Sequence, residues 1–210
     1  MPVKENMKKM AVIRVTTDEE FNWLIGSPIM TTEHPEVKDF YMIADRKEFE
    51  LAKGNILYLC DMYAKDREPL AVIGGYHVGG DDLGKMTNNI YDINIFLISP
   101  DLKLLYGKDE ALNSIITMVR AFCVDKTSYI ITCCLNKYNR NRSAGDYAEV
   151  AMRDYCNFDE YLQEADLGTN TTSMIDTGAR YDIARNRPLN SNDRMMIKVP
   201  TNTDFKTFYN

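Results

Sequence analysis

The chain of 210 residues is poor in metal-ligating side chains, with two histidines, five cysteines and no CxxC pair. A zinc site needs nitrogen or sulfur ligands at characteristic spacings, and no such spacing occurs around His34 or His77. The cysteines are odd in number and lie inside apolar runs, which favours free buried thiols in a reducing compartment over a disulfide framework. We therefore expect no metal site. The cysteines are Cys60, Cys123, Cys133, Cys134 and Cys156.

Long apolar runs are also missing, and none approaches the roughly 20 residues that a membrane helix needs. Residues 11–15 form a short apolar stretch, but Arg14 interrupts it, so it does not resemble the core of a signal peptide. We expect no membrane span and a cytoplasmic location, which would be the host cytoplasm or the virion for a viral protein.

Basic charge is not in excess: the formal net charge is −6 and the sequence pI is about 5.0. This balance disfavours a non-specific nucleic-acid binder, which usually has a basic face. Lys137, Arg140 and Arg142 surround Tyr138 in one local basic cluster. That cluster is either a solvated loop or a contact for phosphate or nucleic acid, and the first alternative is the more common one.

The length and the 45% of apolar residues predict one domain with a substantial core. We assign residues 1–10 to an N-terminal extension, 11–199 to the domain and 200–210 to a polar tail. The tail carries Phe205, Phe208 and Tyr209, which are suited to docking on the domain or on a protein partner.

Hydrophobic periodicity and turn residues predict a mixed central sheet flanked by helices, an α/β (α+β) architecture. Thr17 is a helix N-cap followed by acidic residues. The runs 56–64 and 70–78 form an antiparallel hairpin, in which Gly74 and Gly75 permit a bulge or a close approach. The run 90–99 is apolar almost throughout and therefore central. Strands are expected at 11–16, 56–64, 70–78, 90–99, 128–135, 173–181 and 195–199, and helices after Thr17 and at 45–53, 109–124 and 143–155. Loops are expected at 27–39 and, around the strand at 173–181, over 157–193.

Four segments carry a resemblance to a known family. The hairpin reads ILYLCDMYAKDREPLAVIGGYHV, and the central strand and helix read IYDINIFLISPDLKLLYGKDEALNSIITMVRAF. SYIITCCLNKYNRNRSAGDYAEVAMRDYCNF and DRMMIKV follow. Together they resemble strands two to five, the pyrophosphate loop, the fourth helix and the closing strand of the acyl-CoA N-acyltransferase (GNAT) superfamily. The resemblance implies acetyl-CoA as cofactor and the transfer of its acetyl group to an amine.

The resemblance also implies a cofactor site at the start of the helix 109–124, where backbone N–H groups bind pyrophosphate. Gly107 matches the first glycine of the family's loop. Asp109 stands where a second glycine is usual, and Leu104 stands where Arg or Gln is usual. Asp109 and Glu110 either oppose a bound anion or cap the helix dipole. The cofactor-binding candidates are Ile98, Lys103, Gly107, Lys108, Asp109 and Asn136.

Two residues are candidates for the chemistry that the resemblance implies. Asp92 is the candidate base, and its alternative role is that of a solvated strand end. Tyr155 is the candidate acid for the leaving thiolate, although Arg153 is closest to the family's tyrosine position. Tyr155 and Tyr147 are alternatively packing residues, and Asn136 is alternatively a turn residue.

A second function class stays open because the pyrophosphate loop departs from the family pattern. The chain could be a catalytically silent binding or structural protein with the same fold. Its Asn- and Tyr-rich composition, the long loops after Asn157 and the aromatic tail are compatible with a component of a phage particle.

Overall fold

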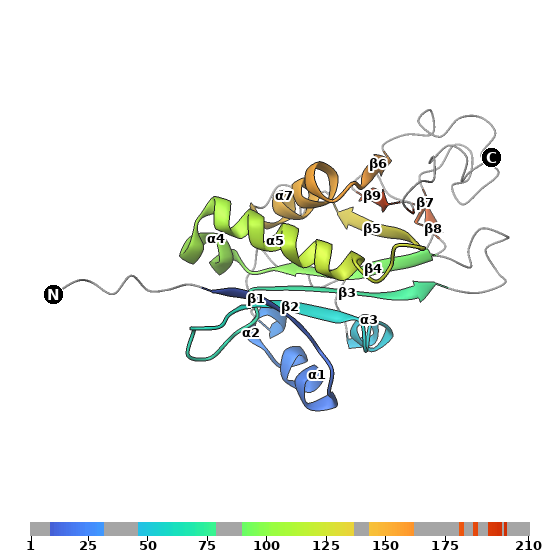
Figure 1. Ribbon diagram of the computed structural model, residues 1–210. Coiled ribbons are helices and arrows are strands. Elements are labelled where there is room, and N and C mark those ends of the chain that lie inside the picture. Colours follow the sequence, from blue (N-terminus) through green and yellow to red (C-terminus); the bar gives the residue numbers. More distant parts are fainter. Residues whose placement is uncertain are drawn as a thin grey trace, which may run out of the picture.

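The computed structural model describes residues 9–31, 46–78, 90–136, 143–161, 181–182, 187–188, 193–198 and 200. Seven strands form one mixed sheet in the order β1-β2-β3-β4-β5-β9-β6. Helices cover both faces of this sheet (Figure 1). The predicted mixed α/β architecture is therefore confirmed. The strands are β1 (Met10–Arg14), β2 (Ile56–Asp61), β3 (Ala71–Val78), β4 (Ile90–Ile98), β5 (Ile130–Asn136), β6 (Asp159–Tyr161) and β9 (Asp193–Lys198), and β7 (Tyr181–Asp182) pairs separately with β8 (Arg187–Pro188).

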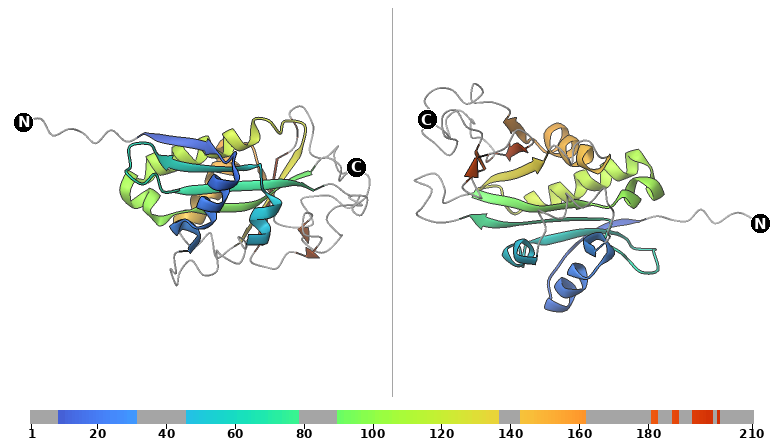
Figure 2. Two further views of the ribbon diagram at one scale, coloured as in Figure 1. Left: turned by 90° about the horizontal axis from the view of Figure 1, so that it is seen from below. Right: turned by 180° about the vertical axis from the view of Figure 1, so that it is seen from behind.

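The helices form two groups, one on each face of the sheet. Figure 2 shows α1 and α3 on the face opposite α5. Apolar side chains fill the space on both sides, so the sheet separates an α5-side core from an α1-side core. The helices are α1 (Asp18–Ile25), α2 (Pro28–Thr31), α3 (Arg46–Leu51), α4 (Pro100–Tyr106), α5 (Lys108–Cys123) and α7 (Ser143–Val150), which continues as a π-helical turn, η3 (Ala151–Tyr155).

The N-terminus of α1 confirms the cap that the sequence predicts. The Glu20 N–H donates to Thr17 Oγ1 over 3.1 Å, and the Thr17 N–H donates back to Glu20 Oε2 over 3.3 Å. This reciprocal capping box satisfies amides that the first helical turn leaves without intrahelical partners. The Thr16 N–H also donates to Glu20, and this bond is the main cause that lowers the pKa of the Glu20 carboxyl.

Several predicted boundaries need correction. Helix α4 was not predicted, although the strand expected at 90–99 ends directly before Pro100. Proline is equally suited to the first position of a helix, and Ser99 caps this one by accepting a bond from the Asp101 N–H over 3.2 Å. Loops were predicted where α2 and β6 occur. Four predicted segments lie mostly or wholly outside the described residues: the strand at 173–181, the basic cluster at 137–142, residues 1–8 and the tail from 201 on.

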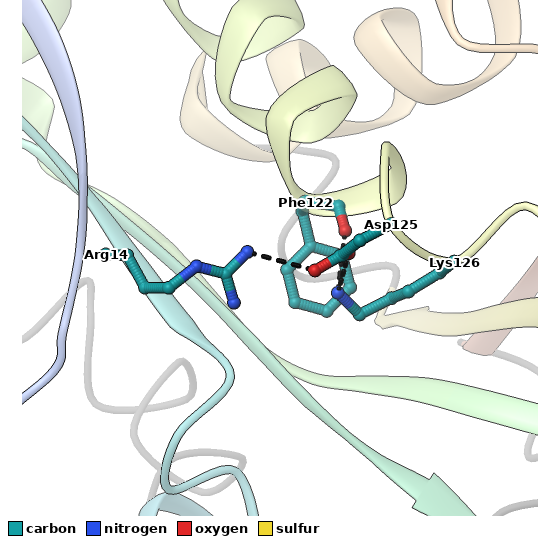
Figure 3. A network of polar contacts seen from close by, with 4 residues as sticks. All are labelled: Arg14, Phe122, Asp125 and Lys126. Carbon is teal, nitrogen blue, oxygen red and sulfur yellow. Dashed lines mark hydrogen bonds and ion pairs between the residues drawn. The ribbon is translucent and has the colours of Figure 1, made fainter.

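A buried lysine ties the end of α5 to β1 (Figure 3). Lys126 Nζ donates to the carbonyl oxygen of Phe122 over 2.9 Å and pairs with Asp125 over 2.6 Å. It also lies 4.3 Å from the centre of the Phe122 ring. From β1, Arg14 reaches the other oxygen of Asp125 over 3.2 Å. The Lys126 side chain is only 4% exposed, so these contacts together replace its lost hydration.

We predict that Asp125 makes the fold sensitive to acid. Burial acts to raise the pKa of Asp125, but the hydrogen bond from Lys126 and the charges of Lys126 and Arg14 outweigh it and hold that pKa below its ordinary value. A lowered carboxyl pKa contributes stability above the unfolded-state value near 4, and this stability is lost as the pH falls below it. Because Asp125 is 50% exposed, the contribution at pH 7 should be at most about 1 kcal/mol.

The measurement is urea unfolding of the wild type and of Asp125→Asn at pH 7 and at about pH 3. The difference in unfolding free energy should be present at pH 7 and shrink at the lower pH. Asp66→Asn changes an exposed turn carboxylate and is the matched control. An equal difference at both pH values would contradict the assigned role of Asp125.

Candidate functional site

The centre of the sheet contains β4 and β5, the only parallel pair among the described strands. Helix α5 lies between them in the sequence, as predicted. Their pairing runs from Ile90↔Ile130 to Ile93↔Cys133 and then stops, although β4 continues to Ile98 and β5 to Asn136. Figure 1 shows the two strands together at one end and apart at the other. We call this opening the fork. The fork begins well before Pro100, directly after the pair Ile93↔Cys133.

A β-bulge explains where the fork begins. In the β3–β4 register, Gly74 opposes Ile95 and Gly75 opposes Ile93, so Asn94 is an extra residue on β4. The side chains confirm that the bulge shifts the alternation between the two faces of the sheet. Ile93 and Phe96 both lie in the α5-side core, although they are three residues apart. A bulge bends its strand and increases the local twist. Asn94 directly follows the last residue of β4 that pairs with β5, so the bulge turns β4 away there.

Gly75 makes the close approach of β3 to the start of the fork sterically feasible. A Cβ atom at this position would lie 2.3 Å from the carbonyl oxygen of Asp92 and 3.0 Å from the Phe122 ring. The predicted role of Gly74 and Gly75 in a bulge or a close approach is therefore confirmed.

The corner between α4 and α5 lies after the carboxyl end of β4. Gly107 adopts φ +84°, a conformation that favours glycine. It is both the C-cap of α4 and the N-cap of α5. A Cβ at Gly107 would have no atom within 4 Å, so the space beside it is open. Tyr106 Oη donates to Asp61 Oδ2 over 3.0 Å and anchors the corner to β2. Burial and this hydrogen bond raise the pKa of Tyr106 to about 12.

The predicted cofactor-binding residues mostly lie at this corner. Lys103, Lys108 and Asp109 are exposed around Gly107, and Glu110 is exposed beside them. Ile98 is the buried last residue of β4. Asn136 ends β5 opposite Asp193, and its side chain lies outside the described residues. The corner thus combines two cations, two carboxylates and the first-turn amides of a 16-residue helix.

Asp92 is not the solvated strand end that was one of its two predicted roles. It is 0% exposed and lies in β4 directly before Ile93, the last paired residue. Tyr91 and Ile93 belong to the α5-side core, so by strand alternation Asp92 points to the opposite face. There Thr132 Oγ1 donates to Asp92 Oδ1 over 2.8 Å. A buried carboxylate therefore lies at the closed end of the fork.

Tyr155 lies away from the corner. It is 47% exposed at the end of η3, where its carbonyl oxygen accepts a bond from Arg120 in the last turn of α5 over 3.1 Å. At 1.5 Å per residue, Arg120 is about 18 Å along the helix axis from Lys108. The structure therefore does not bring Tyr155 to Gly107. Tyr147 is buried in the α5-side core, as its packing alternative implies.

Sequence reasoning missed three residues at the closed end of the fork. Asn94 is the bulge residue, Thr132 binds Asp92, and Tyr76 of β3 is the cross-strand partner of Asp92. Thr132 could have been found, because it is the polar residue in the apolar run that pairs with β4. Asn94 and Tyr76 depend on a register that includes a bulge, which no local pattern reveals.

The cysteines of this region behave as the sequence predicts where they are described. Cys60, Cys123, Cys133 and Cys156 are buried and are not in disulfides. Burial, only partly offset by Lys198, raises the pKa of Cys123 to about 12. Such a thiol is a poor nucleophile at neutral pH.

Within the described ranges, no helix is long and apolar enough to cross a bilayer.

Comparison with known proteins gives only distant structural likeness. No family model matches the chain, and no curated protein matches it. Among solved structures it is similar to a GNAT-family acetyltransferase from Staphylococcus aureus, with 13% identity, a TM-score of 0.45 and coverage of 90% of this chain and 98% of that one. It is also similar to an acetyltransferase from Streptococcus agalactiae, with 6% identity, a TM-score of 0.45 and the same coverage. For a spermidine N-acetyltransferase from Vibrio cholerae the identity is 12%, the TM-score 0.41 and the coverage 90% and 92%. These values are too low to carry a functional argument.

Proposed function

We propose that the chain is a GNAT-type N-acyltransferase that moves an acetyl group from acetyl-CoA to an amine. The fork is the observation that carries this proposal. In open α/β sheets, ligands bind beyond the carboxyl ends of parallel strands. Here β4 and β5 separate at that end, and α5 starts beside the opening with Gly107 as its cap.

The residues of the fork fit the extended arm of acetyl-CoA. Past Ile93, the peptide groups of β4 that face across the gap need partners other than β5, because buried backbone groups are nearly always hydrogen-bonded. An extended ligand with amide groups can pair with such a strand as another strand would. Ile98 and the end of β5 would flank it.

The corner at Gly107 would hold the phosphates. The first-turn amides of α5 and its dipole attract anions, and Lys103 and Lys108 add positive charge. The open space beside Gly107 lets a phosphate approach the backbone. Asp109 and Glu110 oppose this attraction, so we expect weaker binding than an uncharged first turn would give.

Asp92 would be the base of the reaction. Bound acetyl-CoA supplies a thioester carbonyl, which the amine attacks with release of the CoA thiol. As the C–N bond forms and the C–S bond breaks, the amine loses a proton, which Asp92 can accept, and the departing thiolate takes up a proton from solvent. The carboxylate points to the face away from α5, so the amine would enter from the α1 side while the cofactor extends from the α5 corner. Tyr155 is outside this proposal because it lies near the far end of α5.

A catalytically silent binding protein is the second candidate. Its support is the pair of exposed carboxylates, Asp109 and Glu110, in the turn where an anion would bind. In that case the two side chains only stabilise the helix dipole.

We predict that Asp109 weakens the binding of acetyl-CoA. In Asp109→Gly, loss of one like charge and of the side chain's bulk should tighten binding about fivefold, which corresponds to roughly 1 kcal/mol. Asp109→Asn removes the charge alone and should give most of the gain. Isothermal titration calorimetry of the wild type and both variants is the measurement.

Glu19→Gln is the matched control for the change of net charge, because Glu19 is an exposed first-turn carboxylate of α1, on the other face of the sheet. Tight binding by the wild type that neither Asp109 variant alters would show that the phosphates lie elsewhere. If no protein binds acetyl-CoA at millimolar ligand, the transferase proposal is wrong and the silent binding protein is the better account.

A further inference from the structure

We infer that Thr132 is a positioning residue for acyl transfer, whose hydroxyl holds the Asp92 carboxylate at the closed end of the fork. The inference rests on the proposed function, since it assigns Asp92 the role of base. The two residues are direct partners in the parallel register of β4 and β5. Both are 0% exposed, and the hydroxyl donates to the carboxylate over 2.8 Å.

The place of this bond matters because the next pair, Ile93 with Cys133, is the last one before the strands part. Thr132 has a β-branched side chain with few accessible rotamers, so its oxygen is held in place by the β5 backbone. A buried carboxylate without such a donor would turn to other partners or become protonated. Thr132 therefore holds the direction of the Asp92 carboxyl group.

Ionisable groups near Asp92 lie on β3 and on α3. Tyr76 of β3 is its half-buried cross-strand partner, so their Cβ atoms are roughly 5 Å apart. On the α1 side, α3 packs against β3 and β4, and its Arg46, Lys47 and Glu50 are exposed. On β9, the partner of Thr132 is the apolar Ile197. The Thr132 hydroxyl is a polar contact of Asp92 with good hydrogen-bond geometry.

The test uses the full chain, acetyl-CoA and a panel of primary amines, with release of the CoA thiol as the readout. Thr132→Val keeps the shape of the side chain and removes the donor, whereas Thr132→Ser keeps the donor. Loss of a donor to the charged form raises a carboxyl pKa, so the acid limb of kcat/KM should move to higher pH by about one unit in Thr132→Val. Thr132→Ser should retain the wild-type limb.

Two further measurements separate the possible failures. Carbon-13 NMR can follow the titration of the Asp92 carboxyl, with its signal assigned by comparison with Asp92→Asn. In the Thr132→Val variant without ligand, the titration midpoint should move to higher pH by the same amount. If an active enzyme keeps its acid limb in Thr132→Val, the inference is overturned while the proposed function stands. If the wild type neither binds acetyl-CoA nor releases thiol with any amine, the proposed function is wrong and the inference with it.

Discussion

Replacing Gly75 with alanine is expected to destabilise the domain by about 3 kcal/mol, or to prevent folding, because the new methyl group would clash with the neighbouring strand. The methyl carbon would lie 2.3 Å from the carbonyl oxygen of Asp92, and backbone atoms cannot move aside as a flexible side chain can. Relief would require β3 to separate from β4 where the bulge begins. Denaturant unfolding of Gly75→Ala measures the loss.

Gly26→Ala is the matched control. Its φ of −82° is ordinary for alanine, and an added Cβ would meet the nearest atom at 3.5 Å, an ordinary contact distance. Its stability should stay within about 0.5 kcal/mol of the wild type, or rise slightly. If Gly75→Ala were as stable as Gly26→Ala, the close approach of β3 to β4 at the start of the fork would be wrong.

Replacing Asp92 with asparagine is expected to lower kcat for acyl transfer by about 100-fold or more, the range that general-base catalysis contributes. Asparagine has nearly the same shape and can still accept the hydrogen bond from Thr132, but its amide cannot take up a proton. The affinity for acetyl-CoA should change little, because Asp92 faces away from the α5 corner. Steady-state kinetics and calorimetry on the same protein separate the two effects.

Asp101→Asn, at the exposed start of α4, controls for the loss of a carboxylate near the corner and should be as active as the wild type. An Asp92→Asn variant with full activity and reduced stability would show that the carboxylate only supports the sheet. If Asp92→Asn loses both activity and folding, Asp92→Glu is the variant to measure, because it keeps the ionisable group.

Much of the fold could be predicted from local sequence. Turn residues and hydrophobic periodicity predict the capped start of α1, the hairpin of β2 and β3, and the apolar strand β4. The parallel pair of β4 and β5 follows because one helix of the right length separates two apolar strands. These features depend on residues close in the chain, which explains why pattern analysis finds them.

The start of the fork could not be predicted, since it depends on pairing between distant strands. Asn94 looks like an ordinary strand residue until β3 is aligned against β4 and one position is left over. The same alignment buries Asp92, whose charge suggested a strand end in contact with water. Pairing with Thr132 on β5 replaces some of its lost hydration. Helix α4 was missed because Pro100 both ends a strand and begins a helix.

The candidate site was predicted in part. The resemblance led to Gly107 and its neighbours, and the structure gathers Lys103, Lys108 and Asp109 around that corner. Tyr155 was chosen for its closeness in sequence to the family's tyrosine position. A helix carries successive side chains around its axis, so an offset of one or two residues points elsewhere. Whether these residues bind acetyl-CoA stays a prediction.

Amide hydrogen exchange with and without acetyl-CoA tests the central claim most directly, because it locates the ligand on the chain. If the fork is the acyl-CoA site, the ligand should slow exchange in residues 94–98 of β4 and in the first turn of α5. The amides of β1 should be unchanged, since β2 and β3 separate this edge strand from β4. Binding that leaves both fork segments unprotected, or no binding at millimolar acetyl-CoA, would contradict the claim.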